Sequence, residues 1–250
     1  MKRILFTLLW AGSVMSMAWA QTQTMPEGLQ KVMQAHGGLA TWQSLAKLSF
    51  TKGEGEGAEV HTANLHDRRI RVQAQNHAIG FDGNEVWISP AGAEFRGSPR
   101  FYHNLYFYFF SMPFVLADPG IYYQVVPNVT LQGKEYAAVK ISYGNGVGDS
   151  PDDNYILCYD PATYQMEWLM YTVTYGKEGP SEKYSLIRYG DWEATGGVRL
   201  PRSLTWYTYA EGVVGEERSK ATFTEVEVST TAPPDHLFVM PADGKVSPRQ

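Results

Sequence analysis

Apolar and polar residues alternate with a period of two over much of the chain beyond residue 120. The runs AAVKISY (137–143) and SLTWYTY (203–209) show this pattern, and RRIRVQAQ (68–75) shows it earlier in the chain. Such alternation is typical of β-strands, whose successive side chains point to opposite faces of a sheet. Because no helical pattern lies between consecutive strands of this region, we predict antiparallel pairing.

Turn residues mark the ends of several predicted strands. Asp82-Gly83 lies between AIGF and NEVWI, and Glu211-Gly212 separates LPRSLTWYTYA from VVGEERSKATFTEVEV. An Asp-Gly pair between two strand-like runs is a strong hairpin signal. We therefore predict a meandering sheet, in which strands that follow one another in the sequence lie side by side.

Helical patterns are confined to residues 26–48 and 99–112. In the first region Leu29, Val32 and Met33 recur at helical spacing. In the second, Ser98-Pro99 is a good helix start and Pro113 a good helix stop. A helix over 99–112 would be about 21 Å long, too short to cross a bilayer.

Eight of the fourteen residues from Phe101 to Phe114 are aromatic. Their rings surround the predicted helix, so more than one of its sides must be covered. The run YQMEWLMYTVTY (164–175) is also apolar on both faces, which favours a strand buried on both faces. The predicted fold class is mainly β (α+β): a strongly curved antiparallel sheet, or unclosed β-barrel, wrapped around one or two helices.

The first twenty residues have the composition of a secretory signal peptide. Lys2 and Arg3 provide the positive start, Ile4 to Trp10 the apolar run, and Ala18-Trp19-Ala20 a small-x-small cleavage site. Polar residues follow directly. We predict cleavage after Ala20 and a periplasmic or secreted mature chain, residues 21–250, that forms a single domain without a transmembrane anchor.

Charge and cysteine content narrow the possible partners. Loss of Lys2 and Arg3 with residues 1–20 changes the net charge from −5 to −7, and the mature chain has no basic run. This balance argues against nucleic acid or an anionic membrane surface as a partner. The single cysteine, Cys158, permits no internal disulfide and does not lie at the predicted mature N-terminus, so no lipid attachment is expected there. We expect Cys158 to be a buried apolar residue.

The aromatic segment and the run 164–175 are apolar on more than one side, so something must cover the additional apolar surface. The main functional hypothesis is therefore a soluble envelope protein that binds a lipid, an acyl chain or another hydrophobic molecule. Tyrosine hydroxyls would hold a polar head group. The predicted cavity lining consists of aromatic residues and one methionine: Phe101, Tyr102, Tyr106, Phe109, Phe110, Phe114, Trp168, Met170 and Trp206. The alternative is an interaction or sensor module with a fully packed core and another envelope protein as its partner.

Two polar clusters offer weaker alternatives. Asp149, Asp152 and Asp153 could hold a metal ion or serve a hydrolase, but their spacing does not fit a calcium loop, and their composition also suits a turn. Glu59 and His61 would share a strand face, as a metal or acid–base pair or as a solvated, curved strand. Zinc spacings and nucleophile motifs are absent, so we predict no cofactor, metal or catalytic residue and do not favour an enzyme.

Five segments, in order over residues 35–205, resemble an uncharacterised family of exported bacterial proteins. They are AHGGLATWQSL, GFDGNEVW, SMPFVLADPG, GDSPDDNYILCYDPATYQMEWLMYTVTY and DWEATGGVRLPRSL. The order of helices and strands also resembles the outer-membrane lipoprotein carrier (LolA/LolB-like) superfamily. That resemblance implies an unclosed barrel folded over helices, with acyl chains held in the hollow. The chain differs from anchored LolB-like members in having no cysteine at the predicted mature N-terminus.

Overall fold

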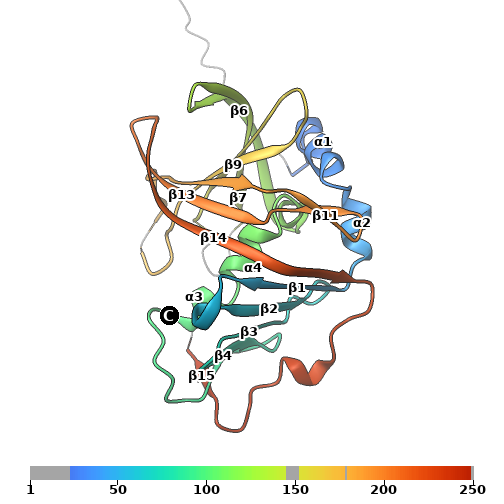
Figure 1. Cartoon of the computed structure of the whole chain (residues 1–250). Coiled ribbons are helices and arrows are strands. Elements are labelled where there is room, and N and C mark those ends of the chain that lie inside the picture. Colours follow the sequence, from blue (N-terminus) through green and yellow to red (C-terminus); the bar gives the residue numbers. More distant parts are fainter. Residues whose placement is uncertain (1–22, 145–151, 178, 249–250) are drawn as a thin grey trace, which may run out of the picture.

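The computed structural model describes residues 23–144, 152–177 and 179–248 (Figure 1). The predicted signal peptide and its cleavage site lie outside these residues. Within the described ranges, most strands form one thirteen-stranded antiparallel sheet, and two form a separate hairpin, β11–β12. The strands are β1 Lys47–Lys52, β2 Glu59–Asn64, β3 Ile70–Gln73, β4 Ala78–Phe81, β5 Val86–Ser89, β6 Ile121–Leu131, β7 Lys134–Tyr143, β8 Tyr155–Tyr159, β9 Met166–Tyr171, β10 Ser185–Gly190, β11 Glu193–Thr195, β12 Val198–Leu200, β13 Ser203–Ala210, β14 Val213–Ser229 and β15 Lys245–Ser247.

Seven short helical segments accompany the sheet in the described part of the chain. The α-helices are α1 Glu27–Ala35, α2 Leu39–Ser44, α3 Pro99–Tyr102 and α4 Leu105–Phe110, and the 3-10 turns are η1 Gly55–Gly57, η2 Phe114–Ala117 and η3 Asp235–Leu237. In this part of the chain, no helix has the length and apolar character needed to span a membrane.

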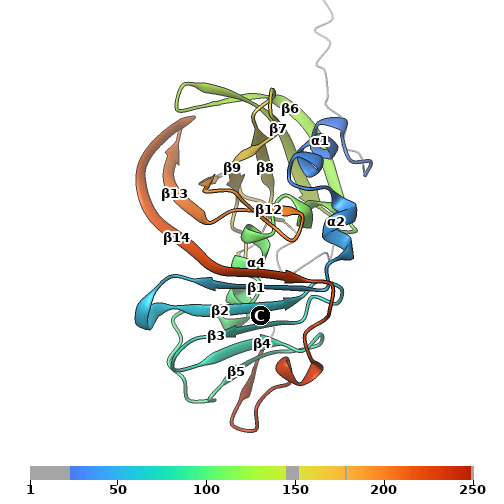
Figure 2. The same cartoon turned by 45° about the vertical axis from the view of Figure 1, so that its right-hand side comes forward.

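The sheet is strongly curved and does not close on itself (Figure 2). Its strand order is β15-β5-β4-β3-β2-β1-β14-β13-β10-β9-β8-β7-β6, so β15 and β6 are its two edges. The seventeen-residue strand β14 joins the two halves: its first part pairs with β13, and its last part, Phe223 to Ser229, pairs with β1. The predicted fold class, a curved antiparallel sheet with few helices, is confirmed.

Both turn signals lie where the sequence pattern places them. Asp82 Oδ1 accepts hydrogen bonds of 2.8 Å from the amides of Asn84 and Glu85, in the connection between β4 and β5. Glu211 and Gly212 have φ angles of 51° and 80° and form the two-residue turn between β13 and β14. Positive φ at both central residues is the geometry whose twist matches a tight hairpin.

The aromatic segment is less regular than the predicted continuous helix. Helix α3 ends at Tyr102, and α4 begins at Leu105. The Arg100 carbonyl, which an uninterrupted helix would use for the amide of Asn104, accepts a hydrogen bond from His103 Nδ1 instead. A side chain that satisfies a helix carbonyl competes with the next turn, and the chain bends at this point.

One apolar core occupies the inner face of the sheet and includes residues from both halves, from α1, α2, α4 and η2. Phe110 stacks on Phe50 with ring centroids 4.3 Å apart, and Phe114 stacks on Trp42 at 4.8 Å. A smaller cluster on the opposite face contains Cys158, Trp168 and Met170. Strand β9 is therefore buried on both faces, as its sequence predicts, and Cys158 is a buried free thiol.

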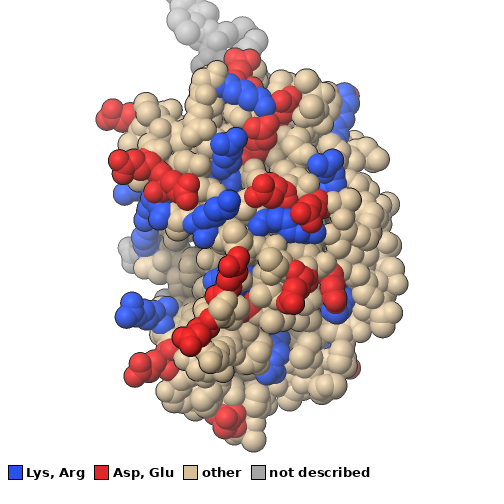
Figure 3. Space-filling model, viewed as in Figure 1, with Lys and Arg blue, Asp and Glu red and all other residues tan. Residues whose placement is uncertain are grey.

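Charged side chains of both signs are interspersed on the face shown in Figure 3, and neither sign forms a continuous patch there. Lys47 and Glu227, at 3.0 Å, link the neighbouring strands β1 and β14, and Lys134 and Glu167, at 2.6 Å, link β7 to β9 across β8. This face has no basic stripe of the kind that tracks a nucleic acid backbone.

Candidate functional site

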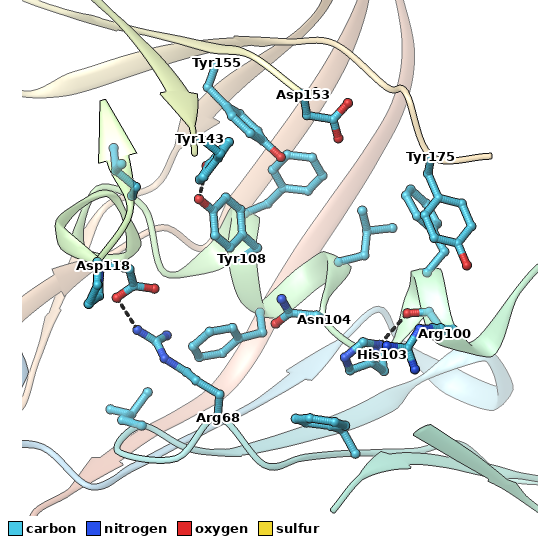
Figure 4. Close-up of a pocket in the computed structure, with 18 of the residues that line it drawn as sticks. Arg68, Arg100, His103, Asn104, Tyr108, Asp118, Tyr143, Asp153, Tyr155 and Tyr175 are labelled. Carbon is cyan, nitrogen blue, oxygen red and sulfur yellow. Dashed lines mark hydrogen bonds and ion pairs between the residues drawn. The ribbon is translucent and has the colours of Figure 1, made fainter. Parts of the chain in front are cut away.

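A cavity of about 610 Å³ lies between the aromatic segment and the inner side of the sheet (Figure 4). Helices α3 and α4 form one wall of this cavity. The β2–β3 connection and Phe81 at the end of β4 form a second wall, and residues of β6, β7 and β8 a third. Several lining side chains are only half-buried, so the cavity is open to solvent. Its volume lies within the range of small-molecule sites, about 300–1,000 Å³.

Much of the lining is apolar. Phe101, Leu105, Phe107 and Phe109 come from the aromatic segment, and Phe81 and Ile121 lie across from them. Successive residues of the aromatic segment point in different directions. Phe109 faces the cavity, while Phe110, next in sequence, is fully buried in the core. Apolar walls of this kind favour an apolar ligand body.

Three tyrosines form one end of the cavity. The hydroxyls of Tyr108 and Tyr143 are hydrogen-bonded to each other, and the Tyr155 ring lies 5.7 Å and 5.9 Å from their rings. Burial raises the pKa of each of these phenols, so all three hydroxyls remain neutral donors and acceptors at physiological pH.

An ion pair forms another part of the lining. Arg68 Nη2 lies 2.5 Å from Asp118 Oδ1, and the guanidinium is 5.2 Å from the centroid of the Phe107 ring. Burial raises the pKa of Asp118, although the charge and hydrogen bond of Arg68 oppose this. A hollow of about 110 Å³ beneath α2 shares Arg68 and Asp118 with the main cavity, so this pair lies between the two spaces.

A second carboxylate, Asp153, lies in the lining near Tyr155. Asp153 is 7% exposed, and its Oδ1 accepts hydrogen bonds from the amide and hydroxyl of Thr174, at 2.7 Å and 2.8 Å. Burial raises the pKa of Asp153, against the lowering effect of the Thr174 bonds. Asp153 is therefore a carboxylate held in place beside a cavity.

The predicted acidic cluster is not assembled in the described part of the chain. Asp152 is exposed, Asp153 lines the cavity, and Asp149 lies outside the described residues. Within that part, no group of three His, Cys, Asp or Glu side chains could hold a metal ion. The geometry thus supplies one buried carboxylate instead of a cluster.

Of the nine residues predicted to line a cavity, Phe101 and Phe109 do so. Phe110 is packed in the core, and Phe114 lines the small hollow instead. The seven residues outside the wall of the main cavity are Tyr102, Tyr106, Phe110, Phe114, Trp168, Met170 and Trp206.

Physical reasons explain these different positions. Trp168 and Met170 lie on the opposite face of the sheet from the cavity. The alternation of side chains in the sequence separates the two faces of a strand, but it does not show which face is concave. Trp206 packs its ring against Phe109 and Tyr106, behind the wall, and donates a hydrogen bond to the Tyr171 hydroxyl at 3.0 Å.

Tyr102 belongs to a separate polar network with Glu59 and His61, a pair whose sequence spacing suggested joint chemistry. Glu59 Oε2 accepts a hydrogen bond from the Tyr102 hydroxyl at 2.5 Å and lies 2.9 Å from Lys52 Nζ and 3.4 Å from His61 Nε2. His61 is 2% exposed and stacks on Phe50. This network attaches α3 to strands β1 and β2.

The missed lining residues come from separate parts of the chain. Arg68, Asp118, Tyr143, Asp153, Tyr155 and Tyr175 belong to different strands or connections. Two of them carry a sequence signal. Asp153 belongs to the acidic cluster that the sequence singles out, although for a metal or hydrolase role, and the alternation of Tyr143 with Ile141 places Tyr143 on the inner face of β7.

Comparison with known proteins agrees with the expected resemblance. The model of a family of unknown function (DUF6503) matches residues 95–185, which include the aromatic segment and strands β6 to β9. No curated protein matches the chain.

Two solved structures are similar at low identity. One is a LolA superfamily protein from Nitrosomonas europaea, with a TM-score of 0.48, 10% identity, and coverage of 78% of this chain and 89% of that chain. The other is a DUF1329 family protein from Desulfovibrio piger, with a TM-score of 0.49, 9% identity, and coverage of 85% and 95%.

Proposed function

We propose that this chain is an exported envelope protein that binds an amphiphilic small molecule, with an apolar body such as an acyl chain, in the cavity beside the aromatic segment. The observation that supports this most is the open volume of about 610 Å³ next to Phe101, Phe107 and Phe109. The alternative, a fully packed interior that serves only a protein partner, expects no space of this size.

The chemistry of the cavity lining fits an amphiphile better than a wholly apolar molecule. Phenylalanine rings and aliphatic side chains cover part of the wall, while tyrosine hydroxyls and two carboxylates provide polar contacts. Apolar contacts supply most of the binding free energy in such sites, and a few polar groups orient the ligand. The polar contacts of this cavity would therefore hold a head group.

A series of straight-chain primary alcohols from six to sixteen carbons tests the proposal. Each methylene that leaves water contributes about 0.8 kcal/mol, so affinity should rise roughly fourfold per methylene while the cavity is filling. Once the cavity is full, the affinity should level off. Titration calorimetry on the purified mature protein measures this series, and a complete lack of binding would contradict the proposal.

A pair of tryptophan variants locates the binding. Leu105→Trp places an indole in the cavity wall, and we expect it to lower alcohol affinity by about tenfold or more, because it fills part of the space. Val125→Trp, at an exposed position of β6, adds the same ring outside and should leave affinity unchanged. Equal effects of both variants would show that binding occurs elsewhere.

A further inference from the structure

The polar end of the cavity at Asp153 has a chemical preference that the proposed function does not specify. Figure 4 shows Asp153 beside Tyr155, across the cavity from Arg68 and Asp118. The side chain is almost wholly buried, at 7% exposure, and lies in the cavity lining. A buried carboxylate is costly unless it is paired with a cation or well supplied with hydrogen bonds.

Only one oxygen of Asp153 is hydrogen-bonded. Both Thr174 bonds end on Oδ1, and across residues 23–144, 152–177 and 179–248 Oδ2 makes no hydrogen bond and no ion pair. Lys177 acts on Asp153 through its charge, but its ammonium group donates to the Val173 carbonyl at 2.9 Å. Oδ2 therefore lacks a donor within the described part of the chain.

The other cavity cations do not meet this need. Arg68 is paired with Asp118, and Figure 4 shows both on the far side of the cavity from Asp153. Arg100 and His103 lie in α3 and at its C-cap, and in the described part of the chain the hydrogen bonds of Asp153 come from Thr174 and not from either of them. Among the residues that the structure describes, Asp153 thus lines the cavity without an ion pair.

Aromatic rings surround the same end of the cavity. Tyr155 and Tyr175 line it, and Tyr175 packs against Phe101 with ring centroids 4.9 Å apart. Aromatic faces attract cations, and a carboxylate with aromatic neighbours is a favourable setting for an ammonium group. This combination does not favour an anionic head group, which the Asp153 carboxylate would repel.

We propose that the ligand is a cationic amphiphile, an alkylammonium compound, whose ammonium group donates to Asp153 Oδ2 between the rings of Tyr155 and Tyr175. This inference rests on the proposed function, because it places the apolar body of the ligand along Phe101 and Phe109. It adds the sign of the head group and the end of the cavity where that group binds.

Three ligands with one ten-carbon chain test the inference: decylamine, decanol and decanoate, each below its aggregation concentration and near pH 7. At this pH the amine is protonated and the acid ionised. We expect the wild-type protein to bind decylamine about tenfold or more tightly than decanoate, with decanol between them, because one charged hydrogen bond has this effect. Titration calorimetry measures all three affinities.

Each alternative result has one meaning. Equal affinities for the three ligands would overturn the inference and leave the proposed function intact. Tighter binding of decanoate would also overturn it, since the head group would then lie at a cation such as Arg100. If none of the three ligands binds, the proposed function itself fails.

Two Asp→Asn variants test whether Asp153 causes the preference for decylamine over decanoate. Asp153→Asn keeps an oxygen for the Thr174 bonds but removes the charge, so we expect the preference for decylamine over decanoate to fall to about twofold or less. Asp152→Asn removes the same charge at the neighbouring, exposed position outside the lining, and should keep the preference. A preference that survives Asp153→Asn would overturn the inference, and the wild-type comparison decides the head-group sign even if this variant does not fold.

Discussion

The Glu59 carboxylate joins three elements through a single oxygen atom. Tyr102 of α3, Lys52 of β1 and His61 of β2 all contact Glu59 Oε2. Burial alone would raise the pKa of Glu59, but the hydrogen bonds from His61, Tyr102 and Lys52 and the Lys52 charge outweigh it and lower the pKa to about 2. The folded protein thus strongly favours the ionised form of Glu59.

This pKa predicts a specific loss of stability in acid. Because the folded pKa lies below the unfolded value of 4.5, the unfolded chain binds the proton more tightly. The stabilisation is fully present above about pH 4.5 and is lost as the pH falls towards 2. The shift corresponds to about 3 kcal/mol of unfolding free energy.

Replacing Glu59 by Gln should remove this pH-dependent contribution. We expect Glu59→Gln to be less stable than wild type at pH 7, and the difference to shrink as the pH falls through the window from 4.5 to 2. Urea denaturation at a series of pH values measures it. Glu54→Gln is the control, because Glu54 is exposed and lies at the start of the 3-10 turn η1, which precedes β2. Its free energy of unfolding should match that of the wild type at every pH. A pH-independent difference for Glu59→Gln would show that lost packing, not charge, causes its effect.

At the scale of single residues, sequence reasoning succeeded where spacing was local. Glu59 and His61 are two positions apart on one strand, so their proximity followed from the period of two alone. Arg68 and Asp118 are fifty positions apart and meet only because the sheet brings their connections together. No local pattern contains that information.

Among the elements, the aromatic segment from α3 to η2 serves both the core and the cavity. Phe110 is fully buried and contacts Phe50 and Phe223, whereas Phe101 is half-buried in the cavity wall. The same substitution at these two positions should therefore have different consequences for stability.

We predict that Phe110→Ala lowers the free energy of unfolding by about 3–5 kcal/mol, because it leaves a cavity in a packed core. Phe101→Ala should cost only about 1 kcal/mol, since its ring already borders open space. Guanidinium denaturation of the two variants makes the comparison. Similar losses would mean that Phe101 is as tightly packed as Phe110.

The sequence predicts strands and hairpins better than the course of the aromatic segment. Alternation and turn residues mark β7, β13 and the β13–β14 hairpin correctly because these signals are local. The helix expected from Pro99 to Met112 divides at His103 and Asn104 because a side chain takes over a backbone acceptor. Helical propensity and proline positions give no sign of such a bond. The direction in which the sheet curves, and hence the position of Trp168, depends on long-range packing.

For the whole molecule, strand β14 and the shared core connect the two halves of the sheet. β14 pairs with both β1 and β13, and the main core contains residues of β3 and β4 together with residues of β8 and β9. We therefore propose that residues 21–250 fold as one domain.

Hydrogen exchange followed by mass spectrometry tests this cooperativity. With rising denaturant, we expect the amides of β3–β4 and of β8–β9 to reach the same opening free energy, because neither half keeps its core without the other. The short β11–β12 hairpin, outside the main sheet, should exchange sooner and serves as the internal comparison. A difference of more than about 2 kcal/mol between the halves would indicate two independently folding units.

The open edges of the sheet also bear on how this architecture accommodates molecules of different size. In a closed barrel, strand number and stagger together set the radius, so the interior cannot widen without a new register. Here β6 and β15 are not joined, and that geometric constraint is absent. The capacity of the cavity depends instead on the bulk of the side chains in its wall, such as Leu105 and Phe101. For the proposed ligand, we therefore expect single substitutions along α3 and α4 to change the preferred chain length without altering any strand pairing.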